Sequence, residues 1–226
     1  MFAVIFEVQP KADRWQDYLD LAAELRPELL QVEGFIDNER FRSVQTEGRV
    51  LSLSIWQDEK ALVRWRTHAG HHVVQEKGRF AVFQDYHLRV GEIAADSSAA
   101  PDVPLPKQRF DTTVVGIAKT VTISEAEPPE AGQGGVRDAN AIRQRLCVPA
   151  IGHTGVVATQ AYSGITKPGK ILLLVSWRDA DAARAWQPPA SPEGIGPLRH
   201  RHVRVIRDYS LADRREAPQY FPPVPR

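Results

Sequence analysis

Three histidines within one short stretch are the side chains best suited to chemistry in this sequence. His68, His71 and His72 lie on or just before the second half of a predicted helix, where His72 shares one face with Gln75 and Glu76. An imidazole with an ordinary pKa of about 6.5 can accept a proton at neutral pH, so this face could supply a general base. Each histidine could equally be solvated or cap a helix end.

Aromatic side chains accompany these histidines. Trp65 could stack on a flat ligand and donate a hydrogen bond from its indole N–H, or it could pack the helix against a sheet. Tyr86 and Tyr209 fall on the apolar faces of predicted strands, which favours a core role with a partner for each hydroxyl. Trp56 and Trp177 end predicted strands, and a structural role is expected for both.

Metal and nucleotide sites are not indicated. The histidine cluster has no carboxylate at a recognised motif spacing, and Gly132–Gly135 is not followed by the Lys-Ser/Thr of a phosphate-binding loop. Cys147 is the only cysteine, which excludes an internal disulfide, fits a reducing compartment and favours a small buried residue. The basic run Arg199–Arg204 divides between two strand faces, which predicts a solvated or barrel-rim face rather than a compact anion site.

Composition places the chain among ordinary globular proteins. Of its 226 residues, 42% are apolar and 25% charged, and the formal charge is +1. No overall field would attract nucleic acid or an anionic membrane. The apolar run at the start, residues 1–8, is too short for a signal peptide or a membrane span, so a cytoplasmic protein is expected.

The first part of the chain, residues 1–93, predicts the order βαββαβ. Pro27 should end or kink the first helix, and Asp58 is a plausible N-cap for the second. The strands are expected at 1–8, 35–44, 49–56 and 80–93. This order is that of a ferredoxin-like unit with two helices on one sheet face.

The same order returns after a Pro/Ala/Ser linker at 94–107. Its elements are expected as strands at 109–124, 153–162, 170–177 and 200–210 and helices at 137–147 and 179–186. The second domain then spans 108–212, and a Pro-rich tail covers 213–226. The fold class is therefore α+β with two tandem ferredoxin-like units.

A shared tryptophan spacing is the strongest sign of the repeat. Trp56 and Trp65 are nine residues apart, as are Trp177 and Trp186. Prolines between 187 and 197 replace the histidine-rich segment and cut the matching helix short. One copy is thus expected to be functional and the other degenerate.

These features give the first half a resemblance to the antibiotic biosynthesis monooxygenase family, which the second half shows weakly. The residues that carry it are Ile55-Trp56, Arg64 to His68, His71-His72, Gln75, Gly78-Arg79, Phe83, Asp85-Tyr86 and Arg89-Val90. The resemblance implies that the two units pair into one α+β barrel, with a pocket between each sheet and its helices. A further homodimer is possible.

The resemblance also implies a cofactor-independent monooxygenase acting on a small aromatic or quinol-type molecule in the first unit's pocket. A histidine would remove a phenolic proton so that the substrate can pass an electron to dioxygen. The expected catalytic residues are His72 and His68, and the expected substrate-binding residues are Trp65, His71, Gln75 and Tyr86. Neither a metal nor another cofactor is expected.

Two alternatives remain. The family's heme-degrading branch shares the tryptophan spacing, but the position of its histidine ligand is Gln75 here, and Glu7 stands where an asparagine is looked for. His72 could replace that ligand if the helix shifts. The other alternative is a binding module without turnover.

Overall fold

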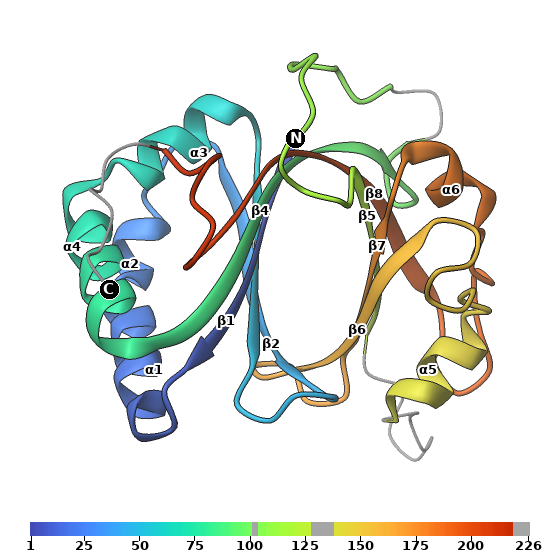
Figure 1. Cartoon of the computed structure of the whole chain (residues 1–226), viewed down its shortest axis with the longest axis horizontal. Helices are drawn as coiled ribbons and strands as arrows, with labels where there is room; N and C mark the ends of the chain where they lie inside the picture. The colour runs from blue at the N-terminus through green and yellow to red at the C-terminus, as the bar shows by residue number, and fades with distance from the viewer. Residues whose placement is uncertain (101–103, 128–137, 219–226) are drawn as a thin grey trace.

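Eight antiparallel strands close into one ring, with the helices on its outside (Figure 1). The computed structural model describes residues 1–100, 104–127 and 138–218. Residues 101–103 of the expected linker, the Gly132–Gly135 stretch and the end of the expected tail lie outside this part. The strand order around the ring is β1-β3-β2-β6-β7-β5-β8-β4.

The first half contributes four strands and its helices in the order that the sequence predicts. The strands are β1 (Phe2–Pro10), β2 (Phe35–Ser43), β3 (Val50–Trp56) and β4 (Phe83–Asp96). The helices are α1 (Trp15–Glu24), α2 (Arg26–Leu29), α3 (Glu59–Arg66) and α4 (Ala69–Lys77). Pro27 sits in the first turn of α2, where its missing N–H costs nothing, and Asp58 caps α3 through the Ala61 N–H at 2.8 Å.

The second half repeats this order with shorter helices. Its strands are β5 (Thr120–Ala126), β6 (Val156–Gly164), β7 (Ile171–Trp177) and β8 (Leu198–Ser210), and its helices are α5 (Ala139–Arg145) and α6 (Ala180–Ala185). Asp179 caps α6 through the Ala182 N–H at 2.8 Å, as Asp58 does in the first half. The two strand-to-helix turns are therefore built alike.

Two strand pairings join the halves. β4 pairs with β8 along most of its length, and β2 pairs with β6 over Phe41–Ser43. Closure leaves no free sheet edge in the ring, which removes the usual site of edge-to-edge association.

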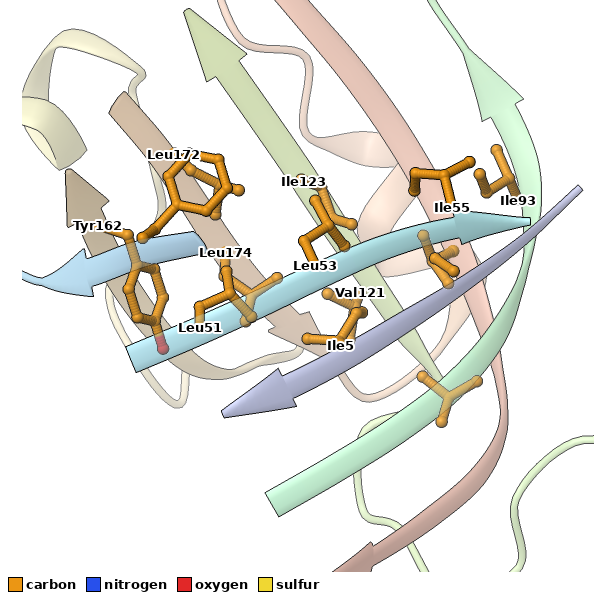
Figure 2. Packing of buried hydrophobic residues seen from close by; sticks show 14 residues of the cluster. Ile5, Leu51, Leu53, Ile55, Ile93, Val121, Ile123, Tyr162, Leu172 and Leu174 are labelled. Atoms are coloured by element: carbon orange, nitrogen blue, oxygen red, sulfur yellow. The ribbon is translucent and has the colours of Figure 1, made fainter. Parts of the chain in front are cut away.

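Side chains alternate between the barrel interior and its helix-covered outside. Figure 2 shows the interior cluster, which includes Ile5, Leu53, Ile123 and Leu174 from both halves. Successive residues in a strand face opposite sides. Ser52 and Ser54, the neighbours of Leu53 on β3, therefore point outward, beneath the helices.

A buried ion pair of the first half lies within this interior and is hydrogen-bonded to the second half. The Arg89 guanidinium contacts the Glu7 carboxylate and donates to Ser176 Oγ at 2.7 Å, while the Tyr162 hydroxyl donates to Glu7 at 2.5 Å. Burial alone would raise the pKa of Glu7, but Arg89 and Tyr162 bring it below its ordinary value. Arg89 therefore forms its ion pair within the first half and reaches the second half through the Ser176 hydroxyl.

A second contact between the halves joins Asp208 of β8 to His87 of β4, at 2.6 Å. Asp85, on the same strand as His87, is exposed.

Three local expectations were wrong. The strand expected at 109–124 begins only at Thr120, because the preceding residues cross the barrel end, where the Thr113 N–H donates to the Val205 carbonyl at 3.0 Å. Phe80 is 47% exposed in a π-helical turn before β4. Cys147 is exposed with a positive φ of 52°, because α5 ends there.

Among the residues that the structure describes, no helix combines the length and apolar character needed to cross a membrane.

Substitution of Arg89 by Met should destabilise the fold, because it leaves the Glu7 carboxylate buried without its cation. The expected loss in the free energy of unfolding is about 3–5 kcal/mol, measured by urea denaturation. Arg184→Met is the control, since Arg184 pairs with Asp181 on the surface, and its midpoint should not change. A loss for Arg89→Met no larger than that of the control would contradict this role.

Candidate functional site

A cavity of about 320 Å³ lies between the outer face of the first half's sheet and helices α1 to α4. Its size is near the lower end of the range for small-molecule sites, about 300–1,000 Å³. The cavity therefore suits a compact ligand.

One side of the cavity floor is polar. Asn38 and Arg40 on β2 stand opposite Ser54 and Ser52 on β3, and all four residues line the cavity. The Asn38 amide donates to Ser52 Oγ at 3.0 Å and to the Leu53 carbonyl at 3.2 Å, which fixes its orientation. This side of the cavity therefore offers polar groups to a ligand.

The middle of the floor is apolar. Val4 and Phe6 on β1 lie between the serines of β3 and Val90 and Leu88 of β4, in continuous cross-strand rows. Phe6 contacts Tyr86, with ring centroids 5.6 Å apart. A hydrophobic ring or chain of a ligand can pack against this strip.

The far side of the floor comes from the second half. Tyr209 and Arg207 of β8 stand opposite Leu88 and Val90, and both line the cavity. Burial raises the pKa of the Tyr209 phenol to about 12, so that it stays protonated at neutral pH. The cavity is thus built from both halves of the chain.

The histidine-rich helix and Trp65 form part of the cavity roof. The His71 ring stacks on Trp65 with centroids 4.3 Å apart, and His71 Nδ1 lies 3.0 Å from the Trp65 carbonyl. Because a carbonyl can only accept, Nδ1 carries the hydrogen and Nε2 is left as the acceptor nitrogen. Burial lowers the pKa of His71 to about 4, although the Trp65 carbonyl opposes the shift, so the ring is neutral at neutral pH.

The other predicted site residues divide into two groups. His72, Gln75 and Tyr86 line the cavity together with Trp65 and His71. His68 does not belong to the cavity lining; it directly precedes α4, at the N-cap position, and its ring lies 3.3 Å from the Glu28 carboxylate. His68 thus stands at a helix end, but its side chain makes no capping hydrogen bond to α4.

Trp65 combines the two roles considered for it, because it lines the cavity and belongs to a buried cluster with Phe2 and Trp56. Trp56 is fully buried and donates to Ser54 Oγ at 2.9 Å. Trp177 is buried likewise and donates to Thr122 Oγ1 at 2.9 Å.

Sequence reasoning missed several lining residues, which are Asn38, Arg40, Ser52, Ser54, Arg207 and Arg214. The alternation of serine with leucine on β3 could have indicated the polar floor. No local pattern indicated that residues after β8 return to the first half.

In the second half, packed side chains fill the corresponding space. Trp186 lies against Trp177 with centroids 5.5 Å apart, and its indole donates to the Leu146 carbonyl at 3.0 Å. Ile142 and Ile195 complete this buried cluster.

The basic run on β8 does not form one site. Arg201 is buried against Glu125 and Asp96, Arg204 pairs with Glu92, and His200 packs edge-on against Trp186. Arg201 and Arg204 therefore form structural ion pairs, whereas a solvated or barrel-rim face was expected. Within the described ranges, no three His, Cys, Asp or Glu residues are grouped to hold a metal ion.

The fold and the cavity define an eight-stranded α+β barrel with a candidate small-molecule site in its first half. Residues 1–77 match the family model described as antibiotic biosynthesis monooxygenase. A jasmonate monooxygenase of Pyricularia oryzae is 40% identical over 228 residues, which cover 99% of this chain and 100% of the relative. The chain belongs to the antibiotic biosynthesis monooxygenase family.

Two further comparisons concern a relative that matches only part of this chain and a solved structure with a similar fold. The uncharacterized protein YqjZ of Bacillus subtilis is 29% identical over 92 residues, 41% of this chain and 78% of the relative. A crystal structure of aldoxime dehydratase in complex with butyraldoxime has a TM-score of 0.53 at 11% identity, over 94% of this chain and 80% of that chain. The latter likeness concerns the fold alone.

The His71 imidazole should remain neutral until the pH falls to about 4. Since the folded pKa lies below the ordinary value, its contribution to stability is complete above about pH 6.5 and is lost as the pH falls toward 4. Long-range ¹H–¹⁵N NMR should show an Nδ1–H tautomer with this titration. A midpoint near 6.5 would contradict the buried, carbonyl-bonded ring.

Proposed function

We propose that this chain is a cofactor-independent monooxygenase acting on a small cyclic metabolite in the cavity of its first half. The observation that supports the proposal most is the meeting of Trp65, His71 and His72 on one cavity, in the half that matches the family model. Aromatic and quinol-type molecules are one substrate class. Jasmonate, a cyclopentanone carboxylate, is the other, because a full-length relative is named for it.

Both classes share the property that the chemistry requires, a proton made acidic by a ring carbonyl or hydroxyl group. Removal of this proton gives a carbanion or phenolate, which can pass an electron to dioxygen. Recombination forms a C–O bond, and return of the proton gives a hydroperoxide. Where the same carbon holds a second hydrogen, loss of water leaves a ketone, so that one dioxygen is consumed without an external reductant.

His72 is the proposed base. Its side chain is half-buried at the cavity, so solvent can take up the proton that the imidazole removes. His71 stays neutral with Nε2 as an acceptor, and it can orient a substrate hydroxyl. Trp65, Gln75 and Tyr86 would contact the substrate. His68 would act only indirectly, through the start of α4.

The two halves are, in this proposal, tandem copies of one ferredoxin-like unit, with domains at 1–93 and 108–212. The repeated element order and the two matching Asp caps support it. Pairing between the copies would take the place of a dimer interface. Association with a second chain stays a prediction.

Heme is the alternative ligand. A cavity of about 320 Å³ favours a smaller molecule, Gln75 supplies an amide rather than an imidazole, and Glu7 faces the barrel interior. These residues do not fit the ligand set that the heme-degrading resemblance implies. A binding module without turnover is the remaining alternative.

Replacement of His72 by Ala should lower kcat by roughly 10²–10⁴-fold, because the base is lost. Oxygen consumption would be measured with hydroxy-aromatics, quinols and jasmonate, without added flavin, metal or reductant. His153→Ala is the matched control, since His153 is an exposed histidine of the second half. An activity within twofold of the wild type for His72→Ala would contradict its role, and no oxygen consumption with any substrate would favour a binding module.

Hemin should not produce a Soret band that depends on the cavity histidines. The test is a hemin titration of the wild type, His71→Ala and His72→Ala, followed by absorbance. A stoichiometric band that either variant abolishes would instead support the heme alternative.

A further inference from the structure

The segment that follows β8 returns to the first half and forms a wall of its cavity. The Leu211 N–H donates to the Tyr86 carbonyl at 3.1 Å, and Arg214 and Pro218 line the cavity. In Figure 1 this red segment lies on the side of α1 to α4, opposite the helices of its own half. The cavity is therefore incomplete without these residues of the second half.

Glu216 fixes this wall in place. Its carboxylate accepts hydrogen bonds from Thr113 Oγ1 at 2.7 Å, from the N–H groups of Val114 and Val115 at 2.7 and 3.0 Å, and from the Asp208 N–H at 2.7 Å. Burial would raise the pKa of Glu216, but these donors hold it below its ordinary value. The segment is thus anchored through a charged acceptor away from the cavity.

This anchoring presents a donor pair to the cavity. The Arg214 guanidinium donates to the Tyr86 hydroxyl and lies over the Tyr209 ring, with its central carbon 5.9 Å from the centroid. Because the Tyr86 oxygen accepts this bond, its own hydrogen remains available to another acceptor. Burial raises the pKa of Tyr86, so the hydroxyl keeps that hydrogen at neutral pH.

Cationic side chains lie at this corner of the cavity. Arg207 also lines it, and among the ion pairs of the described residues none joins a carboxylate to Arg214. The one acidic residue of the described lining, Glu59, is held by Arg109 through two bonds of 2.8 and 2.9 Å. An anionic ligand would neutralise this corner.

We propose that Arg214 and Tyr86 bind a carboxylate of the substrate, and that the segment after β8 thereby selects small cyclic monocarboxylates. A carboxylate offers two acceptor oxygens, which match one guanidinium N–H and the phenol O–H. The rest of such a molecule would lie on the apolar strip of Phe6 and Leu88. The inference rests on the proposed function in that it places the ligand in the same cavity.

The test compares each acid with its methyl ester in binding alone, by isothermal titration calorimetry. The probes are jasmonate, a naphthoate, a hydroxybenzoate and their esters. Arg214→Gln should weaken binding of the acids about 10- to 100-fold and leave the esters unchanged, because a charge-assisted hydrogen bond is lost. Arg214→Lys should restore part of this loss.

Two further variants separate the carboxylate site from general damage. Arg215→Gln is the matched control, since Arg215 is an exposed neighbour that pairs with Asp213, and it should bind like the wild type. Glu216→Gln should weaken acids more than esters, because the wall loses its anchor. Thermal unfolding of each variant would verify that it is folded.

The outcomes distinguish this inference from the oxygenase proposal. Acid binding that depends on Arg214 without oxygen consumption would support the carboxylate site and count against the monooxygenase. Turnover by the wild type with an unchanged acid-to-ester preference in Arg214→Gln would overturn the carboxylate site alone. A wild type that binds none of the acids would overturn it as well.

Discussion

Strand β4 would be an exposed sheet edge if the first half stood alone, and β8 would be another. Their pairing removes both edges, and it also sets which side chains meet across the junction. The register places Tyr209 beside Leu88 and Arg207 beside Val90, so the floor of the first half's cavity continues into the second half. The segment after β8 then emerges directly over Tyr86. The pairing of β4 with β8 therefore both closes the barrel and completes the cavity.

The same constraint allows the two halves to differ. In the second half, Trp186 and Leu146 fill the space beneath short helices, which stabilises the barrel without leaving a site. In the first half, polar residues such as Asn38 occupy the helix-covered face, and a cavity remains. A symmetric dimer would require each copy to provide both a site and a wall. A tandem chain can assign the site to one copy and the wall to the other.

Local patterns in the sequence were sufficient for much of this architecture. The spacing of Trp56 and Trp65, repeated later in the chain, predicted the two matching strand-to-helix turns, and it located the histidine-rich helix. The start of β5 at Thr120 could not be predicted, because residues 109–119 have strand-forming composition but are held across the barrel end by tertiary hydrogen bonds. Arg214 was missed for a related reason. Its position at the cavity depends on contacts between residues more than 100 positions apart. The spacing of apolar residues within one helix or strand cannot indicate such contacts.

A crystal structure with a bound hydroxynaphthoate would test the central claim most directly, because it locates the site and orients the ligand in one measurement. The account predicts the ring in the cavity of the first half, between Phe6 and Trp65, with a reactive hydroxyl toward His72 and the carboxylate toward Arg214. A ligand bound elsewhere on the barrel, or a first-half cavity closed by its own side chains, would contradict the account.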